Sequence, residues 1–347
     1  MRKFLIAITS LILMFSTMLV GCGCSGSKLV FSPLFYDQSK TPNEGYVQQA
    51  TYKVSLKDSY GEDIKKSEQI DAFITYDYNG TYLSKLEVLP NLPSFIKTDM
   101  REEIENSSVL IYKLETVLTL QFTYTLANQE EKSEIDTIQT VTYFTPASSG
   151  FIPIYSSTNS SMHYVATYSE GVKIQKVKAD NNVVYNNKNY VMTTKYDNNA
   201  STTKTYDYTR QTVIDNSELL FVLRNIDLKS KEQYELPTVC YQYGAEKNIM
   251  ITNDGVGTTQ MDVENGAIAV NGEDYDQTQI NVKRYKFRVS EDKSMGVDQF
   301  VYIQNGACGN LGNKNVMYKY VEPIYALGSY SCLGVLEYTL TDFTFSN

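Results

Sequence analysis

A single histidine, His163, limits the chemistry that these 347 residues could carry out. A Ser-His-Asp or Cys-His pair would have to use that one imidazole, and the sequence has no Gly-x-Ser-x-Gly nucleophile motif. His163 lies in an alternating segment on the parity of Val165 and Thr167, which predicts a surface or half-buried histidine on a strand. Composition also disfavours metal sites built on paired histidines. We therefore predict no catalytic residue, no cofactor and no metal site.

Carboxylates are the remaining candidates for acid and base chemistry. Glu130 and Glu131, and the group from Glu273 to Asp276, leave a glycosidase-like pair open, because the required separation of about 5 to 9 Å is a three-dimensional property. Asp274 and Asp276 resemble the start of a calcium loop, but no glycine at the sharp turn and no closing glutamate follow. We interpret them as part of a solvated loop.

Four basic residues gather in one strand-like segment: Lys283, Arg284, Lys286 and Arg288. Such charges commonly solvate a strand face or protect a sheet edge from pairing. The functional alternative is a patch for an anionic partner, such as a phosphate-bearing wall polymer or a lipid headgroup.

Tyrosine is abundant, with 29 residues, whereas tryptophan is absent. Tyr206 and Tyr208 share a strand face, as do Tyr318 and Tyr320. A surface row of such rings could stack on sugars or on a partner protein, although the lack of Trp weakens the sugar hypothesis. Ordinary strand propensity accounts for most of the tyrosines.

The five cysteines are Cys22, Cys24, Cys240, Cys308 and Cys332. None belongs to a Cys-x-x-Cys motif, so a zinc ribbon or a thioredoxin-like centre has no support. The last three are expected to be buried free thiols. Outside the cytoplasm, a disulfide between two of them stays open.

The N-terminus carries an export signal. Met1-Arg2-Lys3 is a basic n-region, and an apolar run to Val20 follows that is too short and wrongly flanked for a stable membrane span. Its end, Leu19-Val20-Gly21-Cys22, resembles the lipobox of bacterial lipoproteins. The resemblance implies that residues 1–21 are a signal peptide and that Cys22 becomes the lipidated N-terminus.

This signal predicts a lipid-anchored protein on the extracytoplasmic side of a bacterial membrane, which contacts membrane lipid through acylated Cys22. Residues 22–45 would form a flexible tether. Loss of Arg2 and Lys3 with the signal leaves 29 basic against 40 acidic residues, a net charge of −11. An acidic body argues against a nucleic-acid partner.

Residues 46–347 follow a period of two. The segment Val109 to Leu126 is the clearest case, because apolar side chains occupy most of its even positions and polar ones most of the odd positions. Its length predicts a bend, a bulge or strong coiling. We expect a mainly β fold, an antiparallel curled sheet of half-barrel or barrel-like form.

Turn dipeptides suited to hairpins punctuate these segments: Asn79-Gly80, Asp254-Gly255, Asn265-Gly266, Asn271-Gly272 and Asn305-Gly306. Asp197 to Asn199 is predicted to turn one more pair of strands. The Ser-rich stretch Thr145 to Ser161 is the best candidate for a sub-boundary, although alternation on both sides favours one continuous sheet system.

One main amphipathic helix is predicted near 217–228, capped by Asn216 or Ser217. A weaker candidate, which could equally be a polar loop, follows Pro93 through Glu105. The capped stretch Asp215 to Arg224 inside a β chain resembles extracytoplasmic β half-barrel proteins of unknown function related in shape to lipoprotein carriers. The resemblance implies a curled sheet around a helix with an apolar concave face, and it supplies no catalytic residues.

The leading functional hypothesis is a non-enzymatic role, binding or carrying a ligand at the cell envelope. The alternatives are a structural or assembly protein that binds an envelope protein through its sheet surface, and a carboxylate-based hydrolase. The hydrolase hypothesis requires two acidic side chains that face each other in a cleft.

Overall fold

The computed structural model describes most of the chain beyond the N-terminal 43 residues. The described ranges are 44–58, 74–107, 109–126, 129–147, 150–168, 171–208, 213–226, 228, 232–240, 245–254, 259–289, 298–325 and 332–346. The predicted signal peptide, Cys22 and nearly all of the predicted tether lie outside these ranges. Within them, no helix combines the length and the apolar character that a bilayer crossing requires.

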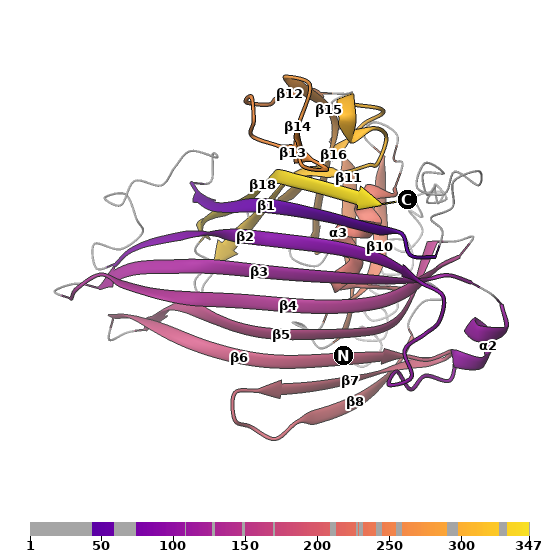
Figure 1. The fold of residues 1–347 in the computed structure, drawn as a ribbon. Coiled ribbons are helices and arrows are strands. Elements are labelled where there is room, and N and C mark those ends of the chain that lie inside the picture. Colours follow the sequence, from indigo (N-terminus) through magenta and orange to yellow (C-terminus); the bar gives the residue numbers. More distant parts are fainter. Residues whose placement is uncertain are drawn as a thin grey trace, which may run out of the picture.

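The first half of the sheet consists of long strands that follow one another in space as in sequence (Figure 1). They are β1 (Val47–Lys57), β2 (Ile74–Leu89), β3 (Ile111–Leu126), β4 (Lys132–Ala147), β5 (Gly150–Tyr168), β6 (Gly171–Tyr185), β7 (Asn189–Tyr196) and β8 (Thr202–Asp207). Each pairs antiparallel with the next.

Shorter strands build the second half. They are β9 (Ile214–Asp215), β10 (Gln233–Cys240), β11 (Ala245–Asn253), β12 (Thr259–Asp262), β13 (Ala269–Val270), β14 (Glu273–Asp274), β15 (Gln279–Val289), β16 (Gln299–Gln304), β17 (Met317–Tyr325) and β18 (Cys332–Ser346). The 3₁₀ helix η4 spans Gly309–Leu311.

The two halves join where β18 pairs antiparallel with β1, so the two terminal strands lie side by side within the sheet (Figure 1). Pairing runs outward from this seam through β17, β16, β15, β11 and β10 to β9. The contacts are antiparallel except β9 with β10 and β13 with β18. The fold is therefore mainly β, with one large, open and curled sheet, as the sequence predicts.

Strand β3 confirms the alternation noted in the sequence. Its even positions from Tyr112 to Tyr124 are mostly buried, while the odd positions after Ile111 are half-buried or exposed. Its pairing with β2 and β4 has no register shift, so of the predicted alternatives, a bend, a bulge or strong coiling, the bulge is absent from β3. Register shifts occur instead in the β1–β18 and β4–β5 pairs, where bulges increase the local twist.

The prediction of a turn at Asn79-Gly80 is wrong. Strand β2 runs straight through these residues, and Gly80 pairs with Val54 on one side and Leu120 on the other. A Cβ at Gly80 would lie 2.0 Å from the main-chain oxygen of Thr119, so glycine is required here for close backbone approach.

Three other predicted turns are present. One is Asn265-Gly266, between β12 and β13, where Gly266 has positive φ. Asn271 and Gly272 both have positive φ between β13 and β14, as a tight hairpin requires. Asp197, also at positive φ, lies in the turn between β7 and β8. The stretch from 145 to 161 falls in β4 and β5, which pair with each other.

The main helix is present and lies behind the long strands in Figure 1. It begins as the 3₁₀ turn η2 (Asn216–Glu218) and continues as α3 (Leu219–Arg224). Its N-cap is Asp215, not Asn216 or Ser217, and Asp215 forms a capping box with Glu218. The weaker candidate after Pro93 contains only the short helix α2 (Arg101–Asn106).

The core fills the inside of the curl. Phe221 of α3 packs against Phe144 of β4 and Phe151 of β5, with ring centroids 5.2 Å and 5.4 Å away. The same cluster continues through β1 to β3 and β15 to β18. A smaller cluster surrounds α2 and the turn between β6 and β7. The sheet thus wraps around its own helix, which leaves space between its two halves at the start of α3.

Candidate ligand-binding site

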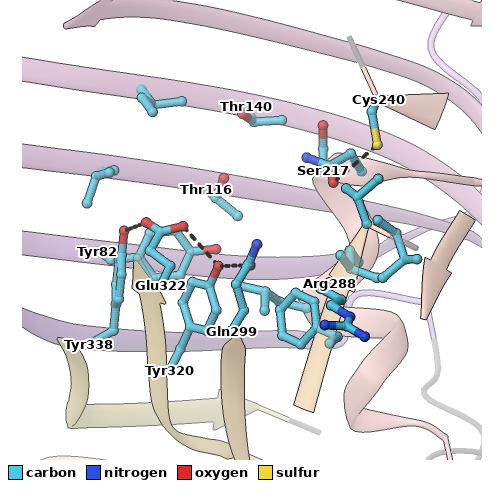
Figure 2. Close-up of a pocket in the computed structure, with 18 residues that line it drawn as sticks. Tyr82, Thr116, Thr140, Ser217, Cys240, Arg288, Gln299, Tyr320, Glu322 and Tyr338 are labelled. Carbon is cyan, nitrogen blue, oxygen red and sulfur yellow. Dashed lines mark hydrogen bonds between the residues drawn. The ribbon is translucent and has the colours of Figure 1, made fainter. Parts of the chain in front are cut away.

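A cavity of about 340 Å³ lies inside the curl (Figure 2). One wall comes from the long strands β2 to β4, and the facing wall comes from β15 to β18. Ser217, Leu219 and Leu220 at the start of α3 contribute a third side. The cavity is therefore bounded by both halves of the sheet and by the helix that they enclose.

A carboxylate occupies the polar end of this cavity. The Tyr320 hydroxyl lies 2.9 Å from Glu322 Oε2 and 2.7 Å from Gln299 Oε1, and the Tyr338 hydroxyl hydrogen-bonds to Glu322 Oε1 (Figure 2). Because a hydroxyl has one hydrogen, Tyr320 can donate to only one of its two acceptors at a time. The Glu322 carboxylate therefore retains accepting capacity toward a ligand.

Burial governs the electrostatics of Glu322. Its side chain lines the cavity and is only half-buried, yet the surrounding protein raises its pKa above the usual range for glutamate. The Tyr338 and Tyr320 hydroxyls oppose that rise because they hydrogen-bond to the charged form. In return, burial and the neighbouring carboxylate raise the pKa of both phenols, which stay protonated as donors.

Aromatic rings surround the carboxylate. The rings of Tyr82 and Tyr338 meet edge to face with centroids 5.5 Å apart. Tyr320 lies 5.1 Å from Tyr338, and Phe287 stacks on Tyr320 at 6.1 Å. All four rings line the cavity. The polar end is therefore a carboxylate within an aromatic wall.

The rest of the lining is mixed. Leu118 and Ile138 present aliphatic surface from β3 and β4, and Thr116 and Thr140 add hydroxyls. Cys240 also lines the cavity; its Sγ lies 3.8 Å from Asn216 Oδ1. Burial, with a contribution from Asp215, raises the pKa of the Cys240 thiol to about 12, so this thiol is unreactive at neutral pH.

The cysteine prediction is confirmed where the structure describes the side chains. Cys240 and Cys308 are both buried free thiols. Neither of these two described thiols takes part in a disulfide.

The predicted basic patch on β15 is largely neutralised. Arg284 pairs with Asp254, while Lys286 and Arg288 approach Asp298 at 3.3 Å and 3.8 Å. The fourth member, Lys283, donates to the Ile226 carbonyl. Of the four, Arg288 lines the cavity, with its side chain 41% exposed. It places one positive charge near the solvent side of the site.

The predicted aromatic surface does not form. Tyr318 and Tyr320 are buried because their face of β17 points into the curl, and Tyr320 lines the cavity instead. Tyr206 and Tyr208 are half-buried and pack on Tyr190, with centroids 5.2 Å and 5.8 Å away. These four residues therefore contribute to packing and, for Tyr320, to the cavity.

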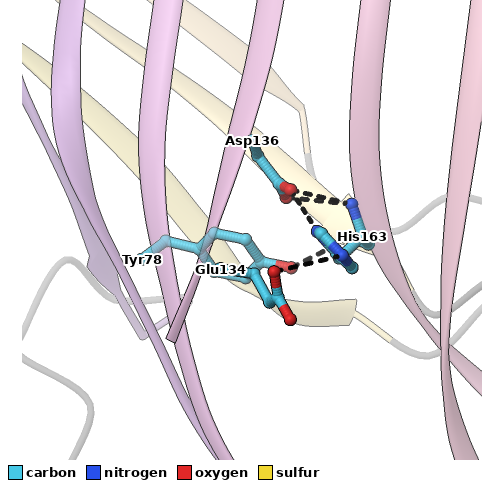
Figure 3. Close-up of polar contacts among 4 residues, drawn as sticks. All are labelled: Tyr78, Glu134, Asp136 and His163. Carbon is cyan, nitrogen blue, oxygen red and sulfur yellow. Dashed lines mark hydrogen bonds and ion pairs between the residues drawn. The ribbon is translucent and has the colours of Figure 1, made fainter. Parts of the chain in front are cut away.

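His163 is buried, contrary to the surface or half-buried position predicted for it (Figure 3). Its Nδ1 lies 2.5 Å from Asp136 Oδ1, and its backbone N–H lies 3.0 Å from both oxygens of that carboxylate. The Tyr78 hydroxyl donates to the His163 carbonyl at 3.4 Å. Burial raises the pKa of Asp136, and the hydrogen bonds from His163 oppose the rise. The hydrogen bonds between His163 and Asp136 therefore connect β5 to β4.

Another buried polar network fixes the start of α3. Asp215 accepts hydrogen bonds of 2.5 Å from Ser156 on β5 and from Tyr185 on β6. Its backbone N–H donates to Glu218 Oε1 at 3.0 Å. Burial and the neighbouring Asp215 raise the pKa of Glu218 well above its usual range. This network holds the helix start against the long strands and so fixes one side of the cavity.

The described residues offer little for other chemistry. Among them, no group of three His, Cys, Asp or Glu side chains is placed to hold a metal ion. Glu322 is the one carboxylate in the described lining of the cavity, which therefore does not supply the facing pair that the hydrolase hypothesis requires.

Sequence reasoning missed Glu322, although a signal exists. Glu322 has the same parity as Tyr318, Tyr320 and Ile324, so an acid interrupts an otherwise apolar strand face. Such an exception within an apolar pattern indicates a buried polar site.

No protein-family model, no curated protein and no solved structure matches this chain.

Proposed function

We propose that this protein is a lipid-anchored, extracytoplasmic bacterial lipoprotein that binds or carries a small ligand at the cell envelope without transforming it. The observation that carries the proposal is the cavity inside the curled sheet, with one carboxylate held among aromatic rings. At about 340 Å³ it falls within the size range of small-molecule sites. Such sites use a small number of placed polar groups to orient the ligand, and Glu322, Gln299 and the tyrosine hydroxyls are candidates for that role here.

The mixed lining argues for a ligand with a polar head and an apolar body. Glu322, Gln299 and the tyrosine hydroxyls provide polar contacts at one end. Aliphatic side chains such as Leu118 and Leu220 line other parts of the cavity. A purely hydrocarbon ligand would leave the Glu322 carboxylate with its tyrosine donors but without a counter-charge in a desolvated site, which is unfavourable.

Ligand binding is tested with a matched pair of variants on one strand. Ile138→Phe adds a ring inside the cavity, whereas Ile135→Phe makes the same change at a residue that is 55% exposed. A panel of small cationic, neutral and anionic amphiphiles is titrated by saturation-transfer NMR. We expect at least one class to bind the unmodified protein and the Ile135→Phe variant, and to bind Ile138→Phe at least tenfold more weakly. If no class binds the unmodified protein, the binding role is wrong.

The membrane anchor is tested separately, in bacteria that express the full chain with an alkynyl fatty acid in the medium. The lipobox at Leu19 to Cys22 predicts label on the protein and loss of that label in the Cys22→Ala variant. Label that persists in Cys22→Ala would refute acylation at this residue.

A further inference from the structure

We infer that the ligand is a small organic cation, an ammonium group on a compact apolar body, which pairs with Glu322 inside the aromatic wall of the cavity. This inference rests on the proposed ligand-binding function and assigns the chemical class of the ligand.

The negative charge of Glu322 favours a cationic ligand. Glu322 is the one acid in the described lining, and its partners Tyr320 and Tyr338 are neutral donors. An ionised carboxylate removed from bulk water is stabilised most by a cation that also donates hydrogen bonds or fills the adjacent space. The protein supplies the hydroxyls, and the ligand would supply the charge.

The aromatic rings that line the cavity also favour a cation. The planes of Tyr82 and Tyr338 are at 88° to each other, so the edge of one ring meets the face of the other, and both rings line the cavity. Tyr320 and Phe287 extend this wall. Aromatic faces attract cations, and several rings around one point are the usual site for alkylated ammonium groups.

The charges of Arg288 and Glu322 differ in sign along the cavity, which favours one orientation of a cationic ligand. Arg288 lies at the half-exposed side, with Gln299 drawn between it and Glu322 in Figure 2. Repulsion from the guanidinium disfavours an ammonium group there and favours one at the Glu322 end. Leu219 and Leu220 of the helix are then available to the apolar body.

Binding would depend on pH, because only the ionised carboxylate attracts the cation. The titratable groups next to Glu322 are Tyr320 and Tyr338 from β17 and β18 and Tyr82 from β2, while Arg288 from β15 lines the cavity farther away, beyond Gln299. The three phenols stay neutral at physiological pH because burial raises their pKa. Affinity should therefore fall on acidification through the raised pKa of Glu322.

The experiment compares ligands that differ in charge and hardly in shape. Choline is titrated against its neutral isostere 3,3-dimethylbutan-1-ol, and n-butylammonium against n-butanol, by saturation-transfer NMR on the full chain. We expect the cation of at least one pair to bind about tenfold to a hundredfold more tightly than its neutral partner. Which pair discriminates then identifies the head as quaternary or primary.

Variants locate the effect. Glu322→Gln keeps the shape and should remove most of the preference for the cation, and Tyr82→Leu should weaken cation binding severalfold. Ile135→Phe, at a residue outside the cavity lining, should leave cation binding unchanged. Circular dichroism checks folding of each variant, and the ligand pairs test the inference on the unmodified chain even where a variant does not fold.

Equal binding within both pairs, abolished by Ile138→Phe, would overturn the cation inference and leave the ligand-binding role intact. Cation preference that survives unchanged in folded Glu322→Gln would also overturn it. Absence of binding by every ligand of the wider panel would instead refute the proposed function itself.

Discussion

Replacement of Gly80 by alanine should destabilise the protein strongly, although Gly80 lies in a regular strand. The added Cβ would lie 2.0 Å from the Thr119 oxygen and 2.9 Å from the Leu120 Cα, both backbone atoms that no rotamer change can move. Ordinary contact requires well over 3 Å, so β2 and β3 would have to separate by about 1 Å or more locally. Loss of two or three ladder hydrogen bonds at about 1 kcal/mol each gives a cost of about 3 kcal/mol.

The assay is urea unfolding followed by circular dichroism and tyrosine fluorescence, since the chain has no tryptophan. Gly272→Ala is the matched control, because Gly272 has φ +82° but a Cβ added there would meet nothing within 4 Å. That variant should lose only about 1 kcal/mol, from the left-handed backbone alone. If Gly80→Ala proved no less stable than Gly272→Ala, the argument from close approach would be wrong.

Three further outcomes are expected. Glu218→Gln should be more stable than the unmodified protein near pH 8, and its free energy of unfolding should depend less on pH. Because the pKa of Glu218 is raised in the folded state, its carboxyl contributes fully to stability below about pH 4.5, and this contribution is lost as the pH rises toward the folded-state pKa. Urea unfolding at about pH 5 and pH 8 measures the difference. Asp136→Asn should cost about 3 kcal/mol of unfolding free energy in the same assay at neutral pH, because it breaks the buried contacts with His163; a loss below about 1 kcal/mol would contradict that role. Cys240 should resist iodoacetamide at about pH 8 and react once urea unfolds the chain, as mass spectrometry of the peptide that contains Cys240 can show. Rapid labelling of that peptide in the native protein would indicate an accessible thiolate.

The strands and the main helix could be predicted from the sequence because their signals are local. The alternation up to Leu126 records which side of β3 faces the core, and the stretch from Asp215 to Arg224 carries both a cap and an apolar face. The predicted cap is wrong by one or two positions, although the pair Asp215 and Glu218 has the spacing of a capping box.

The candidate site depends on contacts that local patterns do not contain. Glu322 meets Tyr338 across a strand pair, and Tyr82 reaches the same cavity from the other half of the chain. His163 and Asp136 likewise meet only once β4 pairs with β5. Asn79-Gly80 shows the opposite error: a local turn signal is overridden by pairing on both sides of β2.

The seam between β1 and β18 has a consequence for biogenesis. Strand β2 is the next described strand after β1, but the other neighbour of β1 is β18, which is synthesised after all the other described strands. Contacts between residues far apart in the sequence must therefore form across the middle of the sheet. Until β18 docks, β1 and β17 present open edges that other chains could capture. The cavity includes Tyr338 on β18, so it is complete only after β18 has docked. A ligand that binds there would therefore stabilise the fully assembled sheet.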